Sequence, residues 1–478
     1  MSSTAQVDTG EEQTELRRVM GPKLLLLFIV GDILGTGVYA LTGEVAAEVG
    51  GAAWVPFLVA FGIAMVTAFS YLELVTKYPQ AAGAALYTHK AFGVHFLTFI
   101  VAFTVMCSGI TSASTASRAF ASNLAKGFGL DAENTTLITV LALSFMALVA
   151  AVNLRGVSES VKANIVLTCV ELSGLLLVIF VGFYALAAGK TDFSQTMVFD
   201  SPSDKSAFLA VTAATSLAFF AMVGFEDSVN MAEETHDPVR NFPKMMISGI
   251  GITGIIYILV ALFAVAIVPV GVLGDSETPL VTVVETAAPG VPIDTLLPFI
   301  SMFAVANSAL INMLMASRLL YGMARQEVLP PFLGRVHRTR QTPYAAILFT
   351  TAIAFGLIWV VTNRTGEVIS ALGGTTALLL LGVFSIVNVC VLVLRKDVKE
   401  RSHFVTPTAL PVVGAVLCLY FVTPFTGRDT IQYQIAGWLL VVGVVLWAIT
   451  WFANRAIRGK KTYMRHPEDI SEREGGVN

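Results

Sequence analysis

Twelve apolar runs, each close to the length needed to cross a bilayer, dominate this sequence of 478 residues. A membrane helix needs about 20 consecutive apolar residues to cross ~30 Å of hydrocarbon. The runs lie at 22–48, 53–77, 91–125, 136–153, 161–188, 206–236, 244–270, 293–326, 343–362, 366–394, 405–423 and 431–453. Strands of membrane barrels alternate over about 10 residues, so these runs predict an all-α polytopic membrane protein with 12 transmembrane helices.

Composition agrees with this fold class. Only 13% of the residues are charged and 55% are hydrophobic, and the mean hydropathy is +0.75. Soluble domains contain about 25% charged residues, so a soluble enzyme is excluded. Gly and Pro number 39 and 18 without a period, which argues against collagen-like or disordered chains. The first apolar run is too long for a cleaved signal peptide, and we expect it to remain as the first span.

The sequence offers little for enzymatic or nucleic-acid chemistry. The four cysteines lie in apolar runs without a CxxC pair, and we expect them to be small buried hydrophobic residues: Cys107, Cys169, Cys390 and Cys418. No Walker motif follows a strand, and no Ser/His/Asp or metal-ligand pattern is present. We therefore predict no cofactor, no firm metal site, no nucleic-acid partner and no enzyme activity.

Basic residues orient the spans, because Lys and Arg concentrate in cytoplasmic loops. If the N-terminus is cytoplasmic, 24 of the 30 Lys and Arg residues lie in inside segments, five lie outside and Arg118 lies within a span. An even number of spans then places both termini on the cytoplasmic side. We expect the protein to lie in the cytoplasmic (plasma) membrane. We expect Arg118 to snorkel to the interface, and the basic segments to contact lipid head groups.

The first span contains a glycine-rich interruption, with Gly31, Gly35 and Gly37 around Asp32. Each glycine destabilises a helix by about 1 kcal/mol relative to Ala. Unwound backbone at this depth is tolerated where it lines a cavity or is buried in protein. Small residues also let neighbouring helices pack closely. This segment alone leaves the cavity and the close-packing interpretation equally open.

The sixth span contains a second interruption. An apolar helix reaches Gly224 and then two adjacent carboxylates, Glu226 and Asp227, before further helix to Thr235. Carboxylates in hydrocarbon are unfavourable unless they are stabilised. The N-terminus of a restarted half-helix would stabilise them. We therefore expect Glu226 and Asp227 to cap the second half of the broken sixth span.

Paired interruptions at matching positions of two repeats are typical of a transporter binding site. Spans 1–5 and 6–10 would form inverted repeats, because each half has an odd number of spans. The predicted organisation comprises a cytoplasmic tail at 1–20, a first repeat at 21–190, a second repeat at 206–394, helices 11 and 12 at 403–455, and a cytoplasmic tail at 456–478.

These features resemble the amino acid–polyamine–organocation (APC) transporters, which have the leucine-transporter fold with broken helices 1 and 6. Four motifs carry the resemblance: Gly35-Thr36-Gly37-Val38-Tyr39, Tyr78-Pro79-Gln80-Ala81-Ala82-Gly83, Ala232-Glu233-Glu234-Thr235 with Asn241-Phe242-Pro243, and Ala316-Ser317-Arg318-Leu319-Leu320-Tyr321-Gly322. The similarity covers about residues 20–400. The run Leu41 to Ala47 is most similar to the cationic amino acid transporter branch.

The resemblance implies a site for the head group of an amino acid. The free N–H groups around Gly35, Thr36 and Gly37 would hold its carboxylate. Four carbonyls at the ends of the first half-helices, close to Gly224, would accept its ammonium group: those of Ile33, Phe220, Ala221 and Val223. Spans 3, 8 and 10 would set side-chain specificity, with Met106, Ser108 and Asn307 as candidates, and Phe219 or Phe220 could form an aromatic gate.

The fifth span departs from the pattern. Many proton-coupled or exchanging relatives resemble this chain but carry a lysine where Glu171 stands. A buried carboxylate can take up a proton, because desolvation disfavours its charged form. It can also bind a metal cation such as sodium, with Asn307 and Ser308 supplying oxygens, or be a hydrogen-bonded Glu without a role in coupling.

Two further acids have alternative interpretations. Asp32 lies at the end of the first half-helix, where a carboxylate opposes the helix dipole, so it should have a cationic partner from the substrate, a coupling ion or a basic side chain. Glu73 could gate the cytoplasmic exit or form an interfacial ion pair.

The expected function is secondary transport of amino acids by alternating access, as a proton symporter or an exchanger. The alternatives are a polyamine or organocation carrier, a membrane sensor that binds without translocating, and a membrane enzyme. The expected partners are an amino acid, protons or sodium, and membrane lipids.

Overall fold

The computed structural model describes most of the chain between residues 20 and 456. The described ranges are 20–80, 83–131, 133–155, 160–200, 205–232, 234–276, 278–289, 293–337, 340, 342–365, 367–397 and 402–456. The two predicted tails lie outside these residues, apart from Met20 and Ala456. Regular structure in the described part is helical, with two isolated bridges, Met20–Thr235 and Gly50–Phe199, and no strand.

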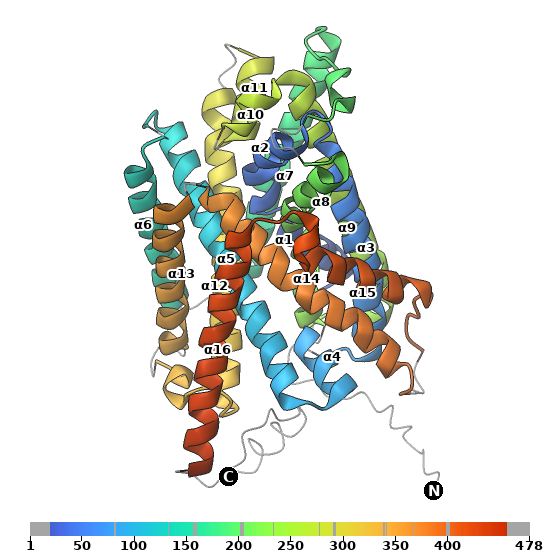
Figure 1. Cartoon of the computed structure of the whole chain (residues 1–478), viewed down its shortest axis with the longest axis vertical. Coiled ribbons are helices and arrows are strands. Elements are labelled where there is room, and N and C mark those ends of the chain that lie inside the picture. Colours follow the sequence, from blue (N-terminus) through green and yellow to red (C-terminus); the bar gives the residue numbers. More distant parts are fainter. Residues whose placement is uncertain are drawn as a thin grey trace, which may run out of the picture.

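The helices follow the predicted apolar runs closely (Figure 1). The α-helices are α1 (Pro22–Ile33), α2 (Thr36–Val49), α3 (Trp54–Lys77), α4 (Gly83–Phe92), α5 (His95–Gly127), α6 (Thr135–Arg155), α7 (Ser160–Ala187), α8 (Ala207–Ala218), α9 (Pro238–Ile267), α10 (Val270–Gly274), α11 (Pro279–Ala287), α12 (Ile293–Arg325), α13 (Tyr344–Thr365), α14 (Val368–Leu394), α15 (Ala409–Val422) and α16 (Thr430–Ala456). The 3₁₀ helices are η1 (Gln195–Met197), η2 (Phe219–Met222), η3 (Asp227–Met231), η4 (Pro331–Gly334) and η5 (Pro424–Thr426).

Eleven helical segments of the described chain are long and apolar enough to cross a membrane. The broken segments Pro22–Val49 and Ala207–Met231 each count once. The predicted span at 405–423 is α15, which has only 14 residues. At 1.5 Å per residue it is about 21 Å long, shorter than the ~30 Å hydrocarbon core.

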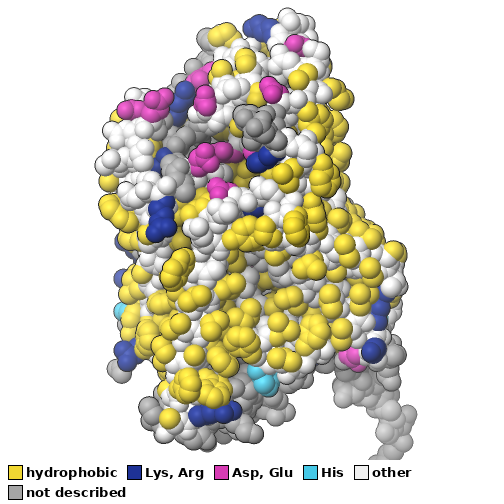
Figure 2. Space-filling model, in the orientation of Figure 1, with side chains coloured by type: hydrophobic (Ala, Val, Ile, Leu, Met, Phe, Trp, Pro, Cys, Tyr) yellow, Lys and Arg dark blue, Asp and Glu magenta, His cyan; other side chains and the backbone are white. Residues whose placement is uncertain are grey.

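The molecule has two ends separated by a broad apolar belt, which Figure 2 shows on one face. We call the end with α4 and the C-terminal ends of α14 and α16 the inner end, and the end with α10 and α11 the outer end (Figure 1). The inner end carries the loops predicted to be cytoplasmic. Charged side chains in Figure 2 gather toward the two ends, as expected for a protein whose middle faces lipid.

Helix α5 runs through the centre of the bundle and packs against α12 and α14. Its side chains are buried almost without interruption from Thr98 to Ala125. This position contradicts the expectation for Arg118, which is only 3% exposed and does not snorkel to the interface. Because α12 and α14 cover α5, its charged side chain has no open path to the membrane surface.

The cysteine prediction holds for three of the four residues. Cys107, Cys390 and Cys418 are buried and free, whereas Cys169 is free but exposed on α7. The prediction for Cys169 was wrong because an outward position on a membrane helix is as apolar in sequence as an inward one.

Candidate functional site

The first predicted interruption is present in the structure. Helix α1 ends at Ile33 and α2 begins at Thr36, with Gly35 in a non-helical conformation at φ −37° and ψ −151°. No side chain caps the N-terminus of α2. The first N–H groups of a helix have no partner within it, so this end of α2 can receive an anion.

The second interruption is also present. Helix α8 ends at Ala218, η2 continues to Met222, and Val223 is extended before η3 begins at Asp227. Gly224 has φ +127°, a conformation that only glycine adopts without strain. The restarted segment is a 3₁₀ helix of five residues. The prediction of further helix to Thr235 was therefore wrong in two respects: the segment is a 3₁₀ helix, and it ends at Met231.

The two interruptions touch each other through glycines. A β-carbon on Gly37 would lie 2.4 Å from Cα of Ala221, and one on Gly224 would lie 2.6 Å from the carbonyl oxygen of Asp32. Both distances are below any normal contact, so neither glycine can gain a side chain unless the backbone moves. The close-packing and cavity interpretations of Gly37 are thus both correct, because a cavity borders this contact.

The cavity beside the interruptions, which we call the central cavity, is small. Its volume is about 20 Å³, room for about one water molecule. An amino acid would enter only after the surrounding helices separate. The lining residues are Asp32, Ile33, Gly35, Thr36, Gly37, Ser112, Phe220, Val223, Gly224, Asp227, Ser308 and Asn312.

Most of the predicted head-group residues line this cavity, and Ala221 lies behind it against Gly37. The lining contains two acids and no Lys, Arg or His. Two of its polar atoms, Oδ2 of Asp32 and Oγ1 of Thr36, are buried without a hydrogen-bond partner among the described residues. Such atoms are unfavourable unless a ligand or water satisfies them, so they are natural contacts for a polar substrate.

The carbonyl of Ile33, predicted to bind the substrate ammonium group, already has a protein partner. The hydroxyl of Tyr257 on α9 donates a 2.6 Å hydrogen bond to this oxygen. A carbonyl oxygen has two lone pairs, so one remains for a ligand. Sequence reasoning missed Tyr257, because no local pattern links α9 to the end of α1.

Ser112 and Asn312 were also missed. Asn312 lies one turn after Ser308 on α12, and its Nδ2 donates to the Ser308 carbonyl at 2.9 Å. Ser308 approaches the first interruption closely, since a β-carbon on Gly35 would lie 3.1 Å from its Oγ. The run of Ser and Thr residues on α5, from Ser108 to Ser117, was the available signal for Ser112.

A second small cavity, the inner cavity, lies between the central cavity and the inner end. Its volume is also about 20 Å³. Its lining residues are Val105, Ser108, Gly109, Val223, Glu226, Asp227, Asn312, Met315, Ala316, Leu319, Thr376 and Leu380. Val223, Asp227 and Asn312 border both cavities and separate them. Of the predicted specificity residues, Ser108 lines the inner cavity, while Met106 and Asn307 are buried outside both linings.

The phenylalanines before Gly224 occupy different places. Phe220 lines the central cavity. Phe219 is fully buried and packs edge-on against Phe384 of α14, with ring centroids 6.0 Å apart. Phe220 is therefore the better placed of the two candidate gate residues.

Glu171 is fully buried on α7, next to the first interruption but outside the two cavity linings. Neither carboxylate oxygen has a hydrogen-bond partner among the described residues. The hydroxyl of Tyr39 on α2 donates to the Glu171 main-chain carbonyl at 2.8 Å. One turn earlier, Thr168 packs against Gly31, where a β-carbon would lie 2.0 Å from Oγ1. Helix α7, which carries this unsatisfied carboxyl group, thus packs against both halves of the first span.

Glu226 does not cap the restarted segment as expected. Its Oε2 accepts a 2.8 Å hydrogen bond from the backbone N–H of Gly224, which precedes it, and η3 has no side-chain cap. The carboxylate stabilises the turn at Gly224 instead. Asp227 begins η3 and faces both cavities.

The fold and the site define the class of this protein: a polytopic helical membrane protein with two interrupted spans that meet at a buried polar cavity. The chain belongs to the amino acid permease family, whose model matches residues 22–449. The family resemblance expected from the motifs is confirmed.

The chain is similar to transporters that are named for different substrates. It is 26% identical over 447 residues to the methylthioribose transporter of Bacillus subtilis (strain 168), covering 89% of this chain and 92% of that protein. It is 24% identical over 471 residues to the branched-chain amino acid permease of the same organism, covering 92% of each. It is 28% identical over 420 residues to the chloroplastic cationic amino acid transporter 9 of Arabidopsis thaliana, covering 82% of this chain and 70% of that protein.

Proposed function

We propose that the chain is a secondary transporter that moves amino acids across the cytoplasmic membrane by alternating access. The observation that carries this proposal is the contact of the two interruptions beside the central cavity, where uncapped N–H groups of α2 and the unpartnered Asp32 oxygen lie together. These groups suit the carboxylate and ammonium of one amino acid. Because the cavity has a volume of only about 20 Å³, substrate entry and release require the helices to separate.

The proposed topology has twelve spans, two inverted five-helix repeats and both termini in the cytoplasm. The distribution of Lys and Arg supports this orientation, with 24 inside and five outside. In this topology α15 is the eleventh span, shorter than the bilayer and lying against α3 and α14. A short helix can cross where the bilayer thins or flanking residues reach the surface.

We propose Glu171 as the group that couples transport to protons in a proton-coupled transporter or an exchanger. Sodium is the alternative coupling ion. An unpaired buried carboxyl group on a helix that contacts both halves of the first span can exchange a proton as these halves move. Asp32, Asn307 and Ser308 remain the candidate partners for a sodium ion.

A polyamine or organocation carrier is the second candidate. It is favoured by the acids Asp32 and Asp227 in a cavity lining without a basic side chain. A polyamine, however, has no carboxylate to occupy the N-terminus of α2. A sensor that binds without translocating is a less favoured third candidate.

Uptake into proteoliposomes tests the function. Labelled neutral, cationic and acidic amino acids and polyamines are supplied with a proton gradient or a sodium gradient imposed separately. We expect accumulation of at least one amino acid, driven by protons or by an amino acid on the opposite side. Accumulation of polyamines alone would favour the second candidate, and binding without uptake would favour the sensor.

A further inference from the structure

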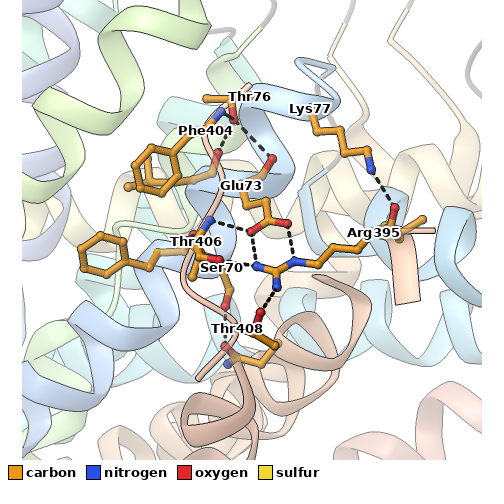
Figure 3. A network of polar contacts seen from close by, with 12 residues as sticks. Ser70, Glu73, Thr76, Lys77, Arg395, Phe404, Thr406 and Thr408 are labelled. Carbon is orange, nitrogen blue, oxygen red and sulfur yellow. Dashed lines mark hydrogen bonds and ion pairs between the residues drawn. The ribbon is translucent and has the colours of Figure 1, made fainter. Parts of the chain in front are cut away.

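The inner ends of α3 and α14 are joined by a partly buried ion pair. Nε and Nη2 of Arg395 donate to the two carboxylate oxygens of Glu73 at 2.9 and 2.8 Å. The Glu73 side chain is 3% exposed and that of Arg395 is 24% exposed. Figure 3 shows the two side chains meeting head-on between the helices. This pairing is bidentate, the geometry in which Arg holds a carboxylate most specifically.

The segment before α15 covers this pair and binds to both partners. Oε2 of Glu73 also accepts a 2.8 Å hydrogen bond from the backbone N–H of Thr406. Arg395 donates to the hydroxyl of Thr408 at 2.7 Å and to the carbonyl of Thr406. The pair is therefore enclosed by α3, α14 and residues 404–408 (Figure 3). The hydrogen bonds to Glu73 raise the pKa of Arg395 above its already high ordinary value, so its charge is constant at physiological pH.

Further contacts tie the same segment to α3. The Thr406 hydroxyl donates to the carbonyl of Phe69 at 2.7 Å, and the backbone N–H of Phe404 donates to Oγ1 of Thr76 at 3.0 Å. The rings of Phe69 and Phe404 stack with centroids 6.0 Å apart. The inner part of α3 is thus bonded to residues 404–406 on both sides of the ion pair.

The connection between α3 and α14 continues above and below the pair. Toward the membrane centre, the hydroxyl of Ser70 donates to Oδ1 of Asn388 at 2.6 Å. Toward the surface, Nζ of Lys77 donates to the Leu394 carbonyl at 2.7 Å and also to the carbonyl of Asp397. Separation of these helices would break every one of these layers together.

Such a junction is poorly suited to open in each transport cycle. Opening would leave the buried carboxylate of Glu73, which is 3% exposed, without its cation and its three hydrogen bonds. An uncompensated buried charge is strongly unfavourable. A gate that opens in every cycle is instead expected to have few and exchangeable contacts.

We infer that Glu73 and Arg395 are positioning residues of a fixed joint, which keeps the inner ends of α3, α14 and the start of α15 together throughout transport. This inference rests on the proposed transport function. From the sequence, Glu73 could either gate the cytoplasmic exit or form an interfacial ion pair. A fixed joint does not open during transport, so this inference excludes the gate.

The joint also restricts where substrate leaves toward the inner end. No described residue of α3 lines the inner cavity, which is bounded by α5, α12, α14 and the residues around Gly224. If α3 and α14 stay together, the exit opens through this cavity, past Leu319 and Leu380. The joint then acts as the fixed wall against which the exit widens.

Cross-linking tests the joint against the gate. In a variant without the four native cysteines, Lys77→Cys and Asp397→Cys are linked by a short bifunctional thiol reagent. The matched control is Leu319→Cys with Leu380→Cys, across the inner cavity. We expect proteoliposome uptake to remain within about twofold after the first link and to fall more than tenfold after the second. Loss of uptake after the first link would overturn the joint, and retained uptake after the second would overturn the exit route.

A second measurement tests whether the joint opens and does not depend on uptake. In the background without native cysteines, Ser70→Cys is labelled with a membrane-permeant thiol reagent, with and without an amino acid gradient. A fixed joint predicts slow labelling that the gradient does not change, and a tenfold rise would overturn it. Failure of uptake in every unlinked variant would count against the transport function. The labelling rate of Ser70→Cys would still show whether the joint stays closed.

Glu73→Gln separates positioning from plain stabilisation. We expect faster labelling of Ser70→Cys and a lower kcat of the folded protein, with an unchanged substrate Kd. The control is Glu285→Gln, which breaks the half-exposed pair with Lys126 at the outer end. If Glu73→Gln lowers only the folded fraction, and kcat per folded molecule is unchanged, the positioning role is wrong.

Discussion

The hydroxyl of Tyr257 donates a 2.6 Å hydrogen bond to the carbonyl oxygen of Ile33, at the point where the first span is interrupted. This bond joins α9 to the last residue of α1 and fixes one of the oxygens proposed to receive the substrate ammonium group. A buried carbonyl without a donor is unfavourable, so Tyr257 also stabilises the interrupted backbone in the absence of substrate.

Tyr257→Phe should therefore weaken substrate binding. Loss of one buried hydrogen bond costs about 1–2 kcal/mol, which corresponds to roughly a 5- to 30-fold higher KM for uptake. The control is Tyr87→Phe, because the Tyr87 hydroxyl is buried without a partner among the described residues, and its removal should leave KM unchanged. Equal KM values for wild type and Tyr257→Phe would show that this carbonyl does not contribute to binding.

Gly37→Ala should abolish substrate binding while the protein still inserts in the membrane. The new methyl group would lie 2.4 Å from Cα of Ala221, so the two interruptions would have to separate. The matched control is Gly62→Ala on α3, where no atom lies within 4 Å of the added carbon. Binding is measured by substrate-induced thermal stabilisation of the purified protein. Normal stabilisation of Gly37→Ala would place the substrate elsewhere.

Glu171→Gln should change the coupling of transport more than the affinity for substrate. The neutral amide cannot release a proton or attract a cation, so uptake should lose its dependence on pH or sodium and KM should change by less than about threefold. Uptake is measured under each gradient separately, with Glu285→Gln at the outer end as the control. Unaltered coupling and transport would assign Glu171 a structural role only.

Asn312→Ala should change which amino acids are preferred. Asn312 separates the central and inner cavities, so its truncation gives a longer substrate side chain more room. We expect roughly a tenfold shift in relative kcat/KM toward longer side chains. Asn123→Ala is the matched control, because Asn123 makes the same bond to the carbonyl four residues earlier, at 2.8 Å, outside both linings. An unchanged substrate ranking would contradict the role of Asn312.

The positions of the spans could be predicted because membrane helices must satisfy their own backbone groups. Each apolar run therefore became a helix, and the glycines at 31–37 and 224 marked the two interruptions. The length of α15 was not predictable, since Pro407 and the contacts of Thr406 with α3 delay its start. The 3₁₀ form of η3 likewise depends on the turn held by Glu226.

The site was predictable where it depends on local backbone and obscure where it depends on distant contacts. The motif around Gly35, Thr36 and Gly37 carries its own signal in the glycine spacing. Tyr257, Asn312 and the Glu73–Arg395 joint come from helices far apart in sequence, so one sequence alone contains no sign that they meet. Arg118 shows the same difficulty, because hydropathy does not tell which face of α5 is covered.

Recognition of the whole amino acid head group is tested by counterflow in proteoliposomes preloaded with an unlabelled amino acid. Competitors for the labelled amino acid are the same compound, its decarboxylated amine and a polyamine. If the N-terminus of α2 binds the carboxylate, the amine and the polyamine should compete at least about 100-fold more weakly than the amino acid, because a charge-assisted site is left empty. Equal competition by the amine or the polyamine would contradict an amino acid site at the two interruptions.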